Sequence, residues 1–445
     1  MAFIPNTDED RKKMLARIGV SSFDELIKDI PEEVRLKGKL DLPPSLSEYE
    51  VVKLLDNYAR MNKTAADYVS YMGGGSYDHF IPTMVESVLE RPEFKTAYTP
   101  YQAEVSQGTL QVMYEFQSMI TELTGMDIAN ASLYDGGSAL GEACFMANAK
   151  NKKTRFLIAG TINPHHKKVI NSITVGKNYT FEEFIAEDGT CDIAALGKAM
   201  NDDVAGVIVQ QPNAYGNLED VFEIEKIAHS NKALYIASVN PLSLGILKPP
   251  SEYNADVCVG EAQPLGIPMN YGGPYLGIFA CKKDFIRIIP GRIVGVTVDT
   301  DGNRGFVLTL QTREQQIKRE KATSNICTNQ GLFMLAATVY MATMGRKGIR
   351  EVAENCLHNA HYLATQIQGL QGYKLLSDKP FWNEFLVIPP VSPENIIAEC
   401  ENKGILAGID TSRYEDCKQG LLVAVTEKRT KKEIDDFVAI LKQFP

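Results

Sequence analysis

The sequence predicts an α/β protein whose main domain is a mostly parallel, doubly wound sheet, followed by a small α+β domain. The first observation is that short apolar runs such as RFLIAG, VAGVIVQQ and ALYIAS alternate with helical segments. Strands that are apolar throughout and separated by helices are typical of a parallel sheet covered on both faces. The second is the length of 445 residues, which is enough for two or three domains.

The elements are expected in three blocks. Residues 1–95 read as an arm of helices and loops, in which Ser47 and Glu50 form a capping box. Residues 96–345 form the large domain, where QGTLQVMYEFQSMITELTG is a helix ending at Gly125 and YDGGSALGEA opens the next. We expect TREQQIKREK to begin a long helix that continues into LFMLAATVYMATM. Residues 346–445 then read as helix, strand, strand and helix, a small α+β domain.

Composition excludes several classes of function. A formal charge of -10 and a pI near 5.3 argue against a surface that neutralises nucleic-acid phosphates. Seven of the first 17 residues are charged, so no apolar signal core can form there, and no apolar stretch is long and uninterrupted enough to span a membrane. The eight cysteines are scattered without a zinc-finger spacing, so we expect reduced thiols and a cytoplasmic location.

One histidine pair has a spacing that can bind metal. His358 and His361 could share a helix face with Glu354. An isolated pair of this kind is more typical of a solvated helix face, so we expect no metal.

Two turn-rich segments are candidates for a site. Gly136, Gly137 and Ser138 lie in a turn that opens a helix, where free backbone N–H groups and the helix dipole favour an anion. The segment AYTPYQAEVSQG gathers polar side chains around Pro100, namely those of Tyr98, Tyr101, Gln102 and Glu104. Such a loop serves equally well as a rigid interdomain connection or as the lining of a polar site.

Six motifs carry a resemblance to a known family. YMGGGSYDHFIP, AYTPYQAEVSQG, ANASLYDGGSALGEA, YGGPYLGIFA, PGRIVGVTVD and TREQQIKREKATSNICT occur in order over about residues 71–330. Together they resemble the P-protein of the glycine cleavage system, and the length resembles its separate alpha subunit. The resemblance implies a pyridoxal-phosphate-dependent transferase fold of the aspartate aminotransferase type.

The same resemblance implies that this chain has lost the catalytic residues. Catalytic chains of the family carry a histidine and a lysine before a glycine-rich loop, and Ala262 and Gln263 stand at those positions. A glutamine amide cannot form the imine that anchors the cofactor. Ala237 matches the carboxylate that keeps the pyridine nitrogen protonated, and Asn163 matches a histidine that stacks on the ring. The nearest lysines lie outside the turn, at Lys248, Lys282 and Lys283.

The resemblance therefore implies a non-catalytic subunit, inactive alone, that pairs with a lysine-bearing beta subunit as αβ or α2β2. The assembled enzyme would decarboxylate glycine and transfer the aminomethyl group to the lipoyl group of H-protein, using pyridoxal phosphate held by the partner. Residues of this chain that would reach the partner's site are those of the Tyr98–Glu104 loop and the turn of Gly73, Gly74 and Gly75. Two alternatives remain: a stand-alone pyridoxal-phosphate enzyme using another lysine, and a purely structural or regulatory partner.

Overall fold

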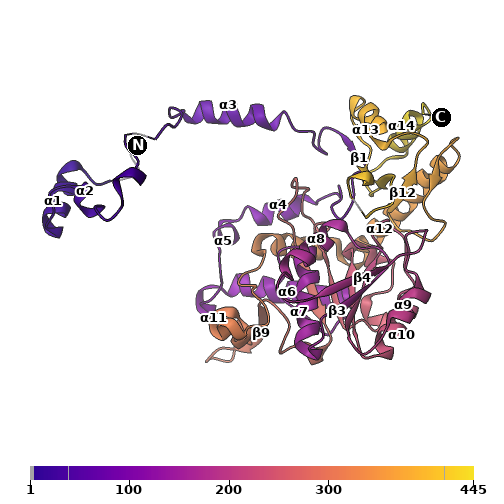
Figure 1. Ribbon diagram of the computed structural model, residues 1–445, viewed down its shortest axis with the longest axis horizontal. Helices are drawn as coiled ribbons and strands as arrows, with labels where there is room; N and C mark the ends of the chain where they lie inside the picture. Colours follow the sequence, from indigo (N-terminus) through magenta and orange to yellow (C-terminus); the bar gives the residue numbers. More distant parts are fainter. Residues whose placement is uncertain (1–4, 39, 415, 445) are drawn as a thin grey trace. The chain divides into compact units, whose positions relative to one another are not determined.

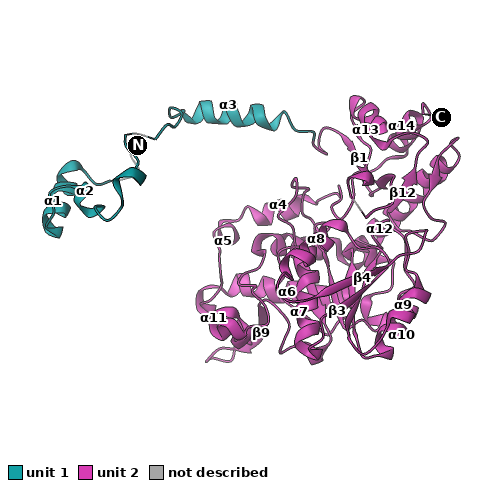
Figure 2. Ribbon diagram, viewed as in Figure 1, with its two compact units in different colours: residues 1–63 teal, residues 64–445 magenta. Residues whose placement is uncertain are grey.

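The structure, a computed structural model, describes residues 5–38, 40–414 and 416–444. The chain divides into two compact units, residues 1–63 and residues 64–445 (Figure 2). The predicted arm of residues 1–95 is thus divided at Lys63, because the chain beyond it packs with the large domain.

The described residues of the first unit form three α-helices and one short 3-10 helix, and none of these residues is buried. The α-helices are α1 (Asp8–Ile18), α2 (Phe23–Leu26) and α3 (Glu48–Ala59). The predicted capping box of Ser47 and Glu50 is confirmed, since the Ser47 N–H donates to the Glu50 carboxylate at 2.8 Å. Large apolar side chains of α3, including Leu55 and Tyr58, are exposed.

The second unit is built on a sheet of seven strands, of which β3 and β4 are labelled in Figure 1. The strand order is β2-β8-β7-β6-β5-β3-β4, and the five strands from β7 to β4 are parallel while β8 runs antiparallel to both its neighbours. The predicted mainly parallel sheet is confirmed. The strands in this order are Ile128–Ala129, Gly277–Cys281, Val257–Glu261, Leu234–Val239, Val204–Gln211, Arg155–Ala159 and Thr180–Phe184.

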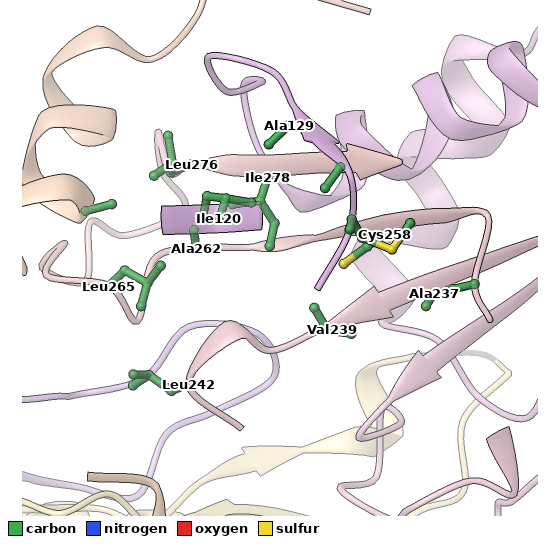
Figure 3. Packing of buried hydrophobic residues seen from close by; sticks show 14 of the residues in the cluster. Ile120, Ala129, Ala237, Val239, Leu242, Cys258, Ala262, Leu265, Leu276 and Ile278 are labelled. Carbon is green, nitrogen blue, oxygen red and sulfur yellow. The ribbon is translucent and has the colours of Figure 1, made fainter. Parts of the chain in front are cut away.

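Helices cover both faces of this sheet, as a doubly wound fold requires. One core contains Ile236 of β6 together with residues of α7 and α8. The other contains Ala237 and Val239 of the same strand with residues of α6, α10 and α12, and Figure 3 shows Ala237 and Ile120 in it. Alternate residues of a strand point to opposite faces, which explains the division. The large-domain helices are α4 (Thr83–Leu89), α5 (Pro92–Lys95), α6 (Gln107–Thr124), α7 (Gly136–Asn151), α8 (Pro164–Ile173), α9 (Ile193–Ala199) and α10 (Val221–Ser230).

The carboxyl-terminal region is the predicted α+β arrangement. Its antiparallel sheet has the order β11-β12-β15-β14, and β1 (Val69–Ser70) pairs with β13 (Ile405–Leu406) beside it. The long helix α12 (Gly331–Gln368) enters it after a break at Gly345, where the backbone is not helical. The sequence places the end of the large domain at the same residue, whereas the contacts of residues 64–445 form one compact unit. The other elements are β11 (Lys374–Leu375), β12 (Glu384–Ile388), α13 (Pro393–Asn402), β14 (Ile409–Asp410), β15 (Leu421–Ala424) and α14 (Lys431–Leu441).

One predicted helix is wrong. TREQQIKREK contains the single turn α11 (Gln315–Lys318) between short 3-10 turns, and α12 begins only at Gly331. Arg319 has a positive φ of 52°, which no helix tolerates. The Arg313 guanidinium donates to the Gly291 carbonyl at 3.0 Å, beside the hairpin of β9 (Ile293–Val298) and β10 (Arg304–Thr309). Such tertiary contacts override a helical propensity of a few tenths of a kcal/mol per residue.

Two further features concern the whole chain. All eight cysteines are free thiols, as predicted. Of the helices that the structure describes, none is long and apolar enough to cross a membrane.

Candidate functional site

Gln263 lies in the loop that follows β7 and is almost completely buried, with 1% of its surface exposed. Its amide nitrogen donates to the carbonyl of Tyr77 at 3.0 Å and to that of Ile267 at 2.7 Å. Its amide oxygen accepts the Tyr77 N–H at 2.9 Å. Every hydrogen-bonding group of the amide is therefore used to hold backbone, and Gln263 acts as a structural link.

Two of these hydrogen bonds go to Tyr77, which belongs to residues 71–79. We call this segment the strap. The strap crosses between the large domain and the carboxyl-terminal sheet. On the large-domain side, the Asn163 side chain donates to the Gly74 carbonyl at 2.7 Å. On the other side, Glu384 of β12 accepts the Gly74 N–H at 2.6 Å and the Tyr77 hydroxyl at 2.9 Å. The strap is thus fixed from both domains.

The glycines of the strap are packed against this chain. A Cβ on Gly73 would overlap the Glu384 carboxylate and the side chain of Ala424, and one on Gly75 would lie 2.7 Å from Asn163. The Gly73–Gly75 turn is therefore in close contact with residues of this chain, although all three glycines remain half-buried.

At the candidate anion turn, the backbone N–H groups are used by acidic side chains of the protein itself. Glu261 at the end of β7 accepts the Gly136 N–H at 3.0 Å, and Asp135 accepts the Ser138 N–H at 2.6 Å. The second Glu261 oxygen accepts the N–H groups of Gln263 and Leu276, both at 3.0 Å. A carboxylate at a helix N-terminus is favoured by the helix dipole. Glu261 therefore uses a backbone donor that an anion would otherwise bind at the start of α7.

A small polar cavity remains between these groups. Its volume is about 40 Å³, whereas sites for organic ligands measure roughly 300–1,000 Å³. It has room for a few water molecules. His166 and Asn383 line it, and each has a buried nitrogen without a hydrogen-bond partner among the described residues. Burial lowers the pKa of His166 to about 4, so its ring is neutral. The residues around this cavity do not fit pyridoxal phosphate.

Ala237 does not line this cavity. Its side chain lies in the core on the other face of the sheet, beside Cys258 of the neighbouring strand β7 (Figure 3). The β6 residue that lines the cavity is its neighbour Ser238. Neither Ala237 nor Ser238 has a carboxylate. The sequence match and the structure therefore both indicate that β6 offers no carboxylate to a cofactor.

The nearest lysines lie elsewhere. Lys282 forms an ion pair with Asp256 at 2.7 Å, and Asp256 precedes β7, at the opposite end of that strand from Gln263. Lys248 pairs with Glu252 at 3.8 Å. No lysine is found among the described residues that line the cavity.

The loop of residues 98–104 lies at the surface. Tyr98 is 84% exposed and Tyr101 is 52% exposed, and the side chains of Gln102 and Glu104 are exposed as well. The Tyr101 hydroxyl donates to Gln316 at 3.0 Å, and the Arg292 guanidinium lies 5.5 Å from the centre of its ring. The loop is therefore anchored through Tyr101 while its other polar groups face outward.

Both histidines of the HNAH segment, His358 and His361, are exposed, and His361 makes structural contacts. His361 stacks on Phe381 and hydrogen bonds to its carbonyl at 3.0 Å, while Glu354 pairs with Arg350 at 2.7 Å.

Sequence reasoning missed the residues that fill the site. Glu261 could have been identified from the sequence, because it is a carboxylate two residues before Gln263, next to the loop that contains Gln263. The roles of Tyr77, His166 and Glu384 had no such signal, since they come from distant parts of the chain.

Glu384 makes a testable contribution to pH dependence. Burial raises its pKa from 4.5 to about 7, although the Gly74 N–H and Tyr77 hydroxyl partly counteract this. A carboxyl with a raised pKa binds its proton more tightly in the folded state, so the free energy of unfolding falls as pH rises from about 4.5 to about 7. Glu384→Gln, which mimics the neutral acid, should reduce that fall by about 3 kcal/mol. Urea unfolding at pH 5 and pH 8 measures the change in the free energy of unfolding. An equal change in the parent protein and in Glu384→Gln would contradict this prediction.

Comparisons with known proteins agree with this geometry. The family model described as glycine cleavage system P-protein matches residues 1–441. A protein named probable glycine dehydrogenase (decarboxylating) subunit 1 from Prosthecochloris aestuarii is 54% identical over 98% of both chains. A protein of the same name from Chloroherpeton thalassium is 51% identical over 100% of both.

Solved structures give the same result. A crystal structure of glycine decarboxylase (P-protein) of the glycine cleavage system, in inhibitor-bound form, superposes with a TM-score of 0.90 at 38% identity, covering 100% of both chains. A sphingosine-1-phosphate lyase from Burkholderia pseudomallei, with a TM-score of 0.67 at 12% identity over 93% of this chain and 94% of the lyase, shows a shared fold alone. The fold is therefore that of the type I pyridoxal-phosphate-dependent enzymes, and the chain belongs to the glycine cleavage system P-protein family.

Proposed function

We propose that this chain is the subunit of a glycine decarboxylase that carries no catalytic lysine, and that it works with a lysine-bearing partner subunit. The observation that carries the proposal is the environment of Gln263. Its amide makes two hydrogen bonds to Tyr77 of the strap and a third to the Ile267 carbonyl in its own loop, so this position serves structure instead of covalent catalysis. Relatives named subunit 1 match the full chain, and such a name implies a second subunit.

The cofactor belongs to the partner in this proposal. Pyridoxal phosphate, when bound there, withdraws electrons as glycine loses carbon dioxide, and the aminomethyl group passes to the lipoyl group of H-protein. Support comes from the cavity of about 40 Å³ and from Glu261, which uses the backbone donors at the start of α7. Since the fold is retained without room for the cofactor, the chain's contribution must come through its surface.

Two surface features support an obligate partner. The Tyr98–Glu104 loop presents a phenol and a carboxylate outward, groups that orient a substrate or relay a proton. The helices of residues 1–63 have no buried residues although they carry large apolar side chains. Exposed apolar surface of this extent marks an interaction site.

The two alternatives make different predictions. A stand-alone pyridoxal-phosphate enzyme would need another lysine near the cavity, and Lys282 is at the far end of β7 in an ion pair. A purely structural or regulatory partner would leave turnover unchanged when the Tyr98–Glu104 loop is altered.

Reconstitution tests the proposal. This chain, the lysine-bearing subunit and lipoylated H-protein are purified separately, and exchange of labelled bicarbonate into glycine is measured with each component omitted. We expect exchange only when both subunits are present. Exchange by this chain with H-protein alone, or full exchange by the other subunit alone, would overturn the proposal.

Covalent trapping tests the cofactor assignment. After incubation with pyridoxal phosphate and reduction with borohydride, peptide mass spectrometry of this chain should detect no specific pyridoxyl-lysine, because Gln263 cannot form an imine. The lysine-bearing subunit, treated identically, is the positive control. A stoichiometric pyridoxyl-lysine at any position of this chain would refute the assignment.

A further inference from the structure

Three side chains of types that bind transition metals come together at the end of the strap. His79 is the last residue of the strap, Cys356 lies on α12, and Glu427 follows β15. His79 Nδ1 lies 2.7 Å from Glu427 Oε2, and Cys356 Sγ lies 3.4 Å from the same oxygen. One ligand atom from each residue can be chosen so that all three lie within 4.8 Å of one another.

The cluster is shielded from solvent, and polar atoms in it and beside it lack hydrogen-bond partners among the described residues. The side chain of His79 is 2% exposed and that of Glu427 is 12% exposed, and Cys356 is buried. His79 Nε2 and the hydroxyl of Tyr340 are buried without a hydrogen-bond partner among the described residues. Tyr340 lies close enough that the charges of Glu427 and Cys356 add to burial in raising its pKa. Unsatisfied buried polar atoms of this kind are uncommon and call for an explanation.

We propose that His79, Cys356 and Glu427 form a binding site for a divalent metal ion of the zinc class. Zinc binds imidazole nitrogen, thiolate sulfur and carboxylate oxygen at about 2.0–2.3 Å in tetrahedral geometry. Those bond lengths place oxygen and sulfur ligands roughly 3.6 Å apart and nitrogen and oxygen ligands roughly 3.3 Å apart. The Cys356–Glu427 separation already fits, and the His79–Glu427 pair must open by about half an ångström.

The charges also suit a buried divalent ion. Cys356 loses its thiol proton to solvent when it binds the metal, so one thiolate and one carboxylate neutralise the ion while neutral His79 adds no charge. Three protein ligands leave a fourth position for water. The nitrogen and sulfur ligands select zinc over magnesium and calcium, which prefer oxygen.

Such an ion would join three distant parts of the chain. The strap, α12 and the segment after β15 each supply one ligand, so the metal would cross-link the large domain to the carboxyl-terminal sheet. Because the metal would bind the folded protein and not the unfolded chain, it raises the melting temperature. None of the three ligands lines the cavity beside Gln263, so the inference does not depend on the function proposed above.

Metal binding by the full chain tests the inference. The protein carries Cys327→Ser to remove its exposed thiol, is stripped with a chelator and dialysed, and is then titrated with zinc sulfate. We expect about one zinc per chain by elemental mass spectrometry, together with a rise in melting temperature. Magnesium at the same concentrations should give neither.

Variants assign the ligands. Cys356→Ala should abolish the bound zinc and the rise in melting temperature, while it keeps the His79–Glu427 hydrogen bond that holds the strap. Cys400→Ala, which removes another buried thiol, is the matched control and should retain one zinc. Circular dichroism checks that both variants are folded. Absence of stoichiometric zinc in the parent protein, or its retention in Cys356→Ala, would show that the cluster is a hydrogen-bonded group without a metal.

Discussion

Glu104→Gln and Tyr101→Phe are each expected to lower glycine turnover of the assembled enzyme by about 100- to 10,000-fold, the usual effect of removing a positioned acid or base. Glu104 is exposed and Tyr101 is half exposed, so a partner can reach both side chains, and the hydrogen bond to Gln316 holds the Tyr101 ring in place. Bicarbonate exchange in the reconstituted enzyme measures the loss. Assembly, followed by size-exclusion chromatography, and the partner's cofactor absorption should be unchanged.

A matched control separates this effect from a general loss of charge. Glu115→Gln removes a partly exposed carboxylate on α6 that pairs with Gln111. It should exchange glycine at the parent rate. If Glu104→Gln and Tyr101→Phe also exchange at near the parent rate, the loop is structural and the chain contributes through assembly alone.

Gly216→Ala is expected to destabilise the chain by about 3 kcal/mol or more. Gly216 lines the cavity with a φ of +84°, and an added Cβ would overlap the backbone carbonyl of Glu384. The left-handed conformation costs an alanine roughly 1–2 kcal/mol, and forcing an extra methyl group into packed atoms costs about 1–3 kcal/mol. Since the carbonyl belongs to β12, it cannot move without disturbing the strand.

The midpoint of urea unfolding measures this effect, and Gly108→Ala is its control. Gly108 lies in α6, and a Cβ there would meet no atom within 4 Å. Alanine is favoured over glycine in a helix by about 0.8–1.0 kcal/mol, so this variant should be slightly more stable than the parent. Equal midpoints for the two variants would contradict the predicted clash at Gly216.

Several features of the fold followed from local sequence. The apolar strands VAGVIVQQ and ALYIAS became β5 and β6 in the centre of a mainly parallel sheet, because a strand buried on both faces must be apolar throughout. The capping box at Ser47 and the start of α7 at Gly136 depend on residues within one turn of the chain. The TREQQIKREK segment failed as a helix because Arg313 is held by backbone carbonyls far away in sequence.

At the site, the sequence by itself determined which chemical groups are present. An amide at position 263 cannot form an imine, whatever surrounds it. Tertiary structure alone decided what fills the remaining space: Glu261 at the N-terminus of α7, Tyr77 on the Gln263 amide, and Glu384 from β12 on the strap. The physical reason is that hydrogen bonds and burial between residues more than a hundred positions apart depend on how the chain packs, and local residue patterns carry no record of that packing.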